Sequence, residues 1–173
     1  LPFYSDQLDT PNWFYTEQLS QQKTIHIIGA GHVGLALSKQ MALLGFRVRI
    51  YDNRLELNTM VNNEAAHEKI VLDYSTIEEY VTEGPDQFLV IMTFGYRDDK
   101  MVLIRLYKKQ FAYIGLMGSQ EKIRQLYLEL EQEGISHEMI SHIHSPIGIQ
   151  IGSKTPEEIA VSIAAEIIGL KNK

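Results

Sequence analysis

A glycine-rich loop lies between a short apolar strand and a helix, and it limits the possible fold classes more than any other part of the sequence. With GxGxxG spacing, the loop consists of Gly29, Ala30, Gly31, His32, Val33 and Gly34. The first glycine permits a tight turn, the second lets a pyrophosphate approach the backbone, and the third lets helix and strand pack closely. The bare N–H groups at such a helix start favour an anion. The loop therefore predicts a nucleotide or a similar phosphate-bearing cofactor, with a purely structural glycine turn as the alternative.

The residues on either side of the loop fit a βαβ unit. The β-branched residues Ile25, Ile27 and Ile28, which stop at Gly29, predict a buried parallel strand. The apolar stretch 32–44 predicts a buried helix that stops at Gly45, and the alternating segment 46–51 predicts a second strand that ends at Asp52. These three elements therefore form a βαβ unit, whose crossover is almost always right-handed.

Strands and helices continue to alternate along the rest of the chain. Further strands are expected over 69–72, 87–92 and 111–116, and further helices over 75–78, 98–109, 119–133 and 156–168. Capping boxes are predicted at Ser75 and at Thr155, the latter followed by Pro156. Segment 135–153 is the least regular. The pattern predicts a Rossmann-like α/β fold, with a doubly wound, mostly parallel sheet of about five strands and helices on both faces.

Length and composition limit the classes of protein that the chain can belong to. Its 173 residues suit one domain, here 23–173, preceded by an aromatic-rich arm over 1–22 that packs on the domain or forms a homodimer interface. A net charge of −6 argues against nucleic acid as a partner. With no Cys, thiolate catalysis and Cys-ligated metals are excluded. No apolar run approaches the roughly 20 residues of a membrane span, so a cytoplasmic protein is expected.

Two residues at the end of the second strand bear on the identity of the ligand. Asp52 follows the glycine loop by about the spacing of a ribose-binding acid. Its carboxylate would accept the ribose hydroxyls and repel a 2′-phosphate, which predicts an NAD-like rather than an NADP-like dinucleotide. Arg54 complicates this prediction, because it could stack on adenine, tolerate a phosphate or be a solvated surface residue.

Ligands of doubly wound sheets bind beyond the carboxyl ends of the strands, where the strand order reverses. This predicts that Thr93, after the 87–92 strand, lines the crevice. Gly118 and Ser119 follow the 111–116 strand and could form a second anion site, although Ser119 could equally be a plain helix N-cap.

Other polar residues give no clear catalytic set. His32 either touches a ligand or packs at the helix start. His142 and His144 are spaced like metal ligands, but no Cys or nearby acid completes a set, so no metal site is predicted. Asp98 and Asp99 are interpreted as capping the following helix rather than as an acid–base pair. No GxSxG motif occurs.

Three motifs in order resemble the C-terminal Rossmann domain of the XdhC/CoxI family. They are GAGHVG at 29–34, YIGLMGS at 113–119, and PIG followed by IGSKTPEEIAVSIAAEI between 146 and 167. The family commonly has Thr-His where this chain has Thr93 and Phe94. The resemblance implies an accessory protein that binds the molybdenum cofactor, assists its sulfuration and delivers it to a xanthine dehydrogenase-type enzyme. It favours a chaperone over a catalyst.

Two other functions stay open at this point. An NAD-dependent oxidoreductase would use His32 or Thr93, but such enzymes normally add a substrate domain. A nucleotide-sensing module would bind NAD without a molybdenum enzyme as partner. The sequence does not distinguish NAD, NADP and molybdopterin as ligands.

Overall fold

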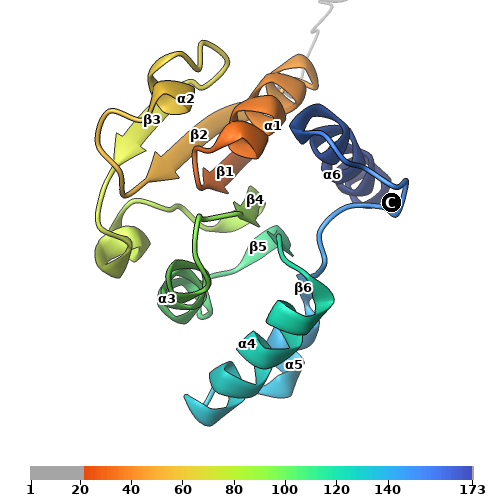
Figure 1. The fold of residues 1–173 in the computed structure, drawn as a ribbon. Coiled ribbons are helices and arrows are strands. Elements are labelled where there is room, and N and C mark those ends of the chain that lie inside the picture. Colours follow the sequence, from red (N-terminus) through yellow and green to blue (C-terminus); the bar gives the residue numbers. More distant parts are fainter. Residues whose placement is uncertain (1–21, 173) are drawn as a thin grey trace, which may run out of the picture.

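The computed structural model describes residues 22–172, which form a six-stranded parallel sheet flanked by helices (Figure 1). The strands are β1 (Thr24–Ile28), β2 (Arg47–Asp52), β3 (Glu68–Val71), β4 (Gly84–Ile91), β5 (Phe111–Leu116) and β6 (Ile143–His144). The helices are α1 (His32–Leu43), α2 (Asn58–Val61), the 3-10 helix η1 (Tyr74–Glu79), α3 (Tyr96–Leu106), α4 (Gln120–Gln132), α5 (His137–Ser141) and α6 (Pro156–Lys171). Apart from Gln22, the predicted arm over 1–22 lies outside the described residues.

The strand order is β3-β2-β1-β4-β5-β6, and every neighbouring pair is parallel. The order reverses between β1 and β4, which pair directly from Thr24 opposite Gln87 to Ile28 opposite Ile91. This is the predicted Rossmann-like, doubly wound fold, and the crevice is expected at the carboxyl ends of these two strands.

Alternating side chains of the central strands supply two cores, one on each face of the sheet. Ile25, Ile27 and Val90 belong to the core that α1 and α6 cover, whereas Ile28 and Ile91 belong to the core beneath η1, α3 and α4. Figure 1 shows α1 and α6 side by side on one face and α3 on the other. Because both faces of the central strands are covered, their sequences are largely apolar, as the prediction requires. The exception in β1 is His26, which is buried and hydrogen-bonded to the Tyr51 hydroxyl and to Gln87.

The structure corrects three local predictions. The N-cap of η1 is Asp73, whose Oδ1 accepts the Ser75 N–H at 2.8 Å, so Ser75 does not open the predicted capping box. Helix α3 begins after Gly95, which places Asp98 and Asp99 in its first turn rather than at its cap. The irregular segment 135–153 contains α5 and the two-residue strand β6, and β6 makes the sheet six strands wide.

Both ends of the described chain lie at the amino-terminal edge of the sheet. One cavity of about 490 Å³ is lined by Gln22, Lys23 and Lys171. Phe46, directly before β2, and Asp86, near the start of β4, line it too. This edge is opposite the carboxyl ends of the strands, where the glycine loop lies. Within residues 22–172, no helix has the length and the apolar character that crossing a bilayer requires.

The start of α6 confirms the second predicted capping box and allows a direct test of it. The Thr155 hydroxyl accepts the Glu158 N–H at 3.2 Å, and the Glu158 carboxylate accepts the Thr155 N–H at 3.1 Å. We expect Thr155→Ala to lower the free energy of unfolding by about 1 kcal/mol, because the Glu158 N–H loses its partner. Urea denaturation measures this change. Thr155→Ser keeps the hydroxyl and should match the wild type; equal losses in both variants would contradict the capping role.

Candidate functional site

A cleft of about 710 Å³ opens at the carboxyl ends of β1 and β4. One wall is the end of the glycine loop and the start of α1, from Gly31 to Gly34. A second wall is the segment 54–59 after β2, and a third is formed by Met92, Thr93 and Phe94 with Met117. The cleft thus lies at the topological switch point, and its volume is within the usual range of ligand pockets.

The three glycines of the loop have different structural roles. Gly29 has a φ of +115°, and a Cβ there would lie 2.2 Å from the Met92 carbonyl oxygen. A Cβ on Gly34 would lie 2.2 Å from the Gly29 carbonyl oxygen. In contrast, a Cβ on Gly31 would meet nothing within 4 Å. Gly29 is therefore required by the turn, and Gly34 by the packing of α1 against the loop, as predicted. Gly31 instead leaves open space at the cleft.

Both long helices that begin at the switch point lack a side-chain cap. The N-cap of α1 is Gly31 and that of α3 is Gly95, and neither helix start has a side-chain hydrogen bond. By comparison, Ser119 caps α4 and Thr155 caps α6. Uncapped N–H groups and the positive end of the helix dipole make the start of α1 suited to an anion.

Asp52 fixes the glycine loop to the end of β2. Its Oδ2 accepts the Ala30 N–H at 2.7 Å, and the residue is only 1% exposed. Arg54 pairs with the same carboxylate through Nε and Nη2, both at 2.8 Å. Although burial alone would raise the pKa of Asp52, the hydrogen bonds from Arg54 and Ala30 hold this pKa below its ordinary value. In this structure Asp52 is an ionised residue that supports the loop, and Arg54 covers it.

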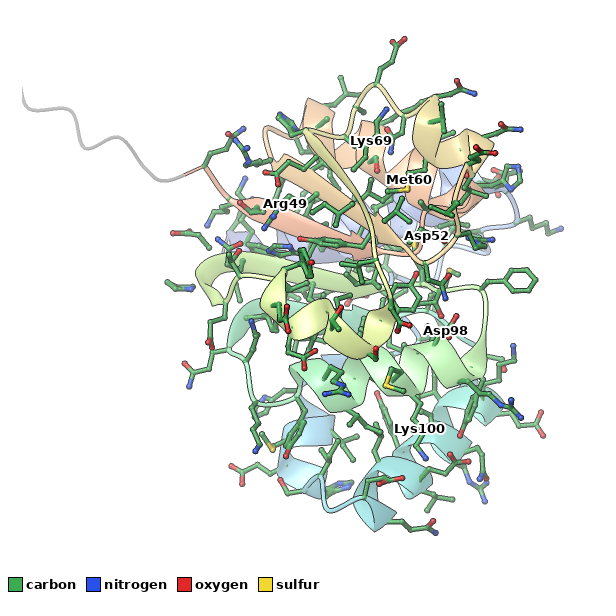
Figure 2. All side chains as sticks on the ribbon, turned by 90° about the vertical axis from the view of Figure 1, so that its left-hand side faces the viewer. Arg49, Asp52, Met60, Lys69, Asp98 and Lys100 are labelled. Carbon is green, nitrogen blue, oxygen red and sulfur yellow. The ribbon has the colours of Figure 1, made fainter. Side chains whose placement is uncertain are left out.

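Arg54 and Phe94 form the part of the cleft next to Asp52. The Arg54 guanidinium carbon lies 5.6 Å from the centre of the Phe94 ring. Phe94 is 89% exposed, and both residues line the cleft. Figure 2 shows Asp52 and Asp98 at the same end of the sheet, away from Arg49. Arg54 is therefore a partly exposed cation that is paired with Asp52 and lines the cleft.

Thr93 is bound to Asp99, a contact that the sequence does not reveal. Asp99 Oδ1 accepts the Thr93 hydroxyl at 2.6 Å and the Thr93 N–H at 3.1 Å. Burial raises the pKa of Asp99 to about 6, against the opposing effect of these hydrogen bonds. Both residues also line a smaller adjoining cavity of about 200 Å³, which reaches Gly118 and Lys122. Asp99 thus positions the Thr93 side chain between the two cavities.

The remaining predicted site residues are distributed as follows. His32 is exposed and lines the cleft, so it is not a core residue. Ser119 accepts the Lys122 N–H at 3.3 Å as the N-cap of α4 and borders a separate surface hollow, which places it outside the cleft. His144 Nδ1 lies 3.1 Å from a Glu166 oxygen. Among residues 22–172, no group of three or more His, Cys, Asp or Glu side chains could hold a metal ion.

Comparison with known proteins identifies close relatives of this chain. Residues 25–167 match the family described as the XdhC Rossmann domain. The uncharacterized protein YqeB of Escherichia coli K12 is 34% identical over 147 residues, which cover 84% of this chain and 27% of that protein. A protein of Bacillus subtilis 168, described as a probable subunit of xanthine dehydrogenase, is 29% identical over 95% of this chain and 47% of that protein.

A solved structure agrees with these sequence matches. The crystal structure of a xanthine dehydrogenase from Bacillus halodurans superposes with a TM-score of 0.76 and 32% sequence identity, covering 88% of this chain and 44% of that chain. The chain therefore spans less than half the length of each of these three relatives.

The close contact at Gly34 can be tested against the open position at Gly31. Gly34→Ala should lower the free energy of unfolding by at least about 2 kcal/mol, because its Cβ collides with the Gly29 backbone. Gly31→Ala, the matched control, should change it by no more than about 0.5 kcal/mol. Chemical denaturation measures both. Equal stability of the two variants would show that the loop does not pack against α1 as described.

The raised pKa of Asp99 predicts a pH-dependent effect of Asp99→Asn. The folded state holds the Asp99 proton more tightly than the unfolded chain, so ionisation of this residue costs stability as the pH rises from 3.8 to about 6. The neutral Asn avoids this cost. We therefore expect the stability of Asp99→Asn relative to the wild type to increase across this pH range and to level off above it, by at most about 3 kcal/mol. Urea denaturation at several pH values measures the difference; a constant difference would contradict the prediction.

Proposed function

The chain belongs to the XdhC Rossmann domain family, and from this we propose that it is the cofactor-binding domain of an accessory protein that assists maturation of a xanthine dehydrogenase-type molybdenum enzyme. The observation that carries the proposal is the open cleft over the uncapped start of α1, where a Cβ on Gly31 would meet nothing within 4 Å. A phosphate or pyrophosphate needs this combination of free space and unpaired N–H groups.

The residues at the cleft fit a phosphate-bearing cofactor. The amides that follow Gly31 would hold a phosphate, and His32 and Thr93 line the space around it. Arg54 adds a cation beside Asp52, and Phe94 adds an exposed ring that a planar base or pterin can stack on. A dinucleotide and the molybdenum cofactor both combine a phosphate with a ring system. The bound group would supply any redox chemistry, while this chain binds and orients it.

The described part of the cleft favours a binding role over catalysis. Asp99 is occupied with Thr93, and Asp52 is occupied with Ala30 and Arg54. These two acids therefore stabilise protein structure, while Glu56 also lines the cleft. The relatives named for xanthine dehydrogenase support an association with a molybdenum enzyme, and we propose the same partner for this chain.

Titration of the chain with NAD, NADP and molybdopterin tests the binding proposal. Isothermal titration calorimetry should show saturable binding of at least one of them. Indifference to all three would overturn the proposal. Co-purification with a xanthine dehydrogenase-type enzyme tests the accessory role; tight dinucleotide binding without any such association would instead favour a nucleotide-sensing module.

Gly31→Val should block the cleft while the fold survives. Its added methyl groups would occupy the space in which a phosphate approaches the backbone, so we expect binding of NAD, NADP and molybdopterin to weaken at least about 100-fold, or more than about 2.7 kcal/mol. Thermal denaturation should show an unchanged melting temperature. Gly169→Val makes the same replacement near the end of α6, where a Cβ also meets nothing within 4 Å, and should leave binding intact. Undiminished affinity in Gly31→Val would show that the ligand binds elsewhere.

A further inference from the structure

The Asp52 carboxylate has no acceptor position left for a ribose. Its Oδ2 accepts the Ala30 N–H at 2.7 Å and Arg54 Nη2 at 2.8 Å. Its Oδ1 accepts the Arg54 backbone N–H at 3.0 Å and Arg54 Nε at 2.8 Å. A carboxylate offers about four lone-pair positions, and here all of them are used. Since NAD-specific sites recognise the ribose hydroxyls with this acid, the feature that selects NAD is missing from the surface of the cleft.

Arg54 presents hydrogen-bond donors at the place where an NAD site presents an acceptor. A guanidinium has five N–H groups, and Asp52 engages the Nε–H and one on Nη2, which leaves about three for a ligand. The Arg54 side chain is 39% exposed and lines the cleft. Planar, bidentate donors of this kind match the geometry of a phosphate.

The guanidinium is held in place before any ligand arrives. Asp52 binds one edge of it in a two-bond arrangement, and Phe94 lies 5.6 Å away on the side of the cleft. A cation fixed in this way loses little side-chain entropy when it binds a ligand. This favours ligands that carry a phosphate at this position over ligands that lack one. The nearby carboxylates of Glu56 and Asp98 oppose an added phosphate, so the selectivity should be moderate.

From these contacts we infer that Arg54 is a specificity-determining residue, which makes the cleft prefer a dinucleotide with a phosphate on its adenosine ribose, NADP, over NAD. The inference rests on the proposed cofactor-binding function and reverses the ligand preference that Asp52 alone suggests. Arg54 neutralises the Asp52 carboxylate, which would otherwise repel a 2′-phosphate, and turns its remaining donors toward the cleft. The same contacts predict that 2′-phosphoadenosine 5′-phosphate, which carries only the adenosine half, binds more tightly than 5′-AMP.

Calorimetric titration of the chain with NADP and NAD, and with the two adenosine fragments, tests the inference. We expect NADP to bind about tenfold more tightly than NAD, the usual effect of one or two hydrogen bonds to a charged group. In Arg54→Ala the uncovered carboxylate should accept the ribose hydroxyls and repel the 2′-phosphate, so the preference should reverse. Arg47→Ala, at the opposite end of β2, is the matched control and should leave the ratio unchanged.

Arg54→Lys keeps the inference testable if Arg54→Ala does not fold. It preserves the charge beside Asp52 but loses the planar pair of donors, so the preference for NADP should decrease without a reversal. NAD binding as tightly as NADP to the wild type would overturn the inference and leave the proposed function standing. If molybdopterin binds but neither dinucleotide does, the inference is likewise overturned and the proposed function stands. Indifference to all three ligands would overturn both.

Discussion

The hydrogen bond from the Ala30 N–H to the Asp52 carboxylate is the contact on which the site depends. It joins the loop after β1 to the end of β2, so that the first turn of α1 starts at a fixed position over the switch point. The contact is strong because a buried carboxylate accepts it and because Arg54 compensates the buried charge. With the loop fixed, Gly29 and Gly34 bring backbone and helix together, and Gly31 is left facing the cleft.

Much of the fold follows from local patterns in the sequence. The apolar runs of β1, β4 and β5 and the capping box at Thr155 have short-range causes, and the structure confirms them. The elements that the sequence does not reveal are short. Strand β6 has two residues and α2 has four, too few for any periodicity, and their positions depend on tertiary contacts with β5 and α1.

The position of the cleft follows from the sequence, but the hydrogen-bond partners of its side chains do not. GxGxxG spacing and the end of β4 locate the cleft, because the fold brings them together. The pairing of Arg54 with Asp52 and of Asp99 with Thr93 depends on side-chain conformations that no spacing rule specifies. These pairings change the chemistry of the cleft, since they engage two acids within the protein, while a guanidinium, the exposed Phe94 ring and Glu56 line the cleft.

Gln22 and Lys171 line the same cavity at the amino-terminal edge of the sheet, with the cleft at the opposite edge. The first and last described residues of the domain are therefore neighbours. A domain with this geometry can be joined to other polypeptide segments at an edge remote from the cleft. Changes in what is attached there need not alter the cleft, and a protein engineer can immobilise the domain by the same edge.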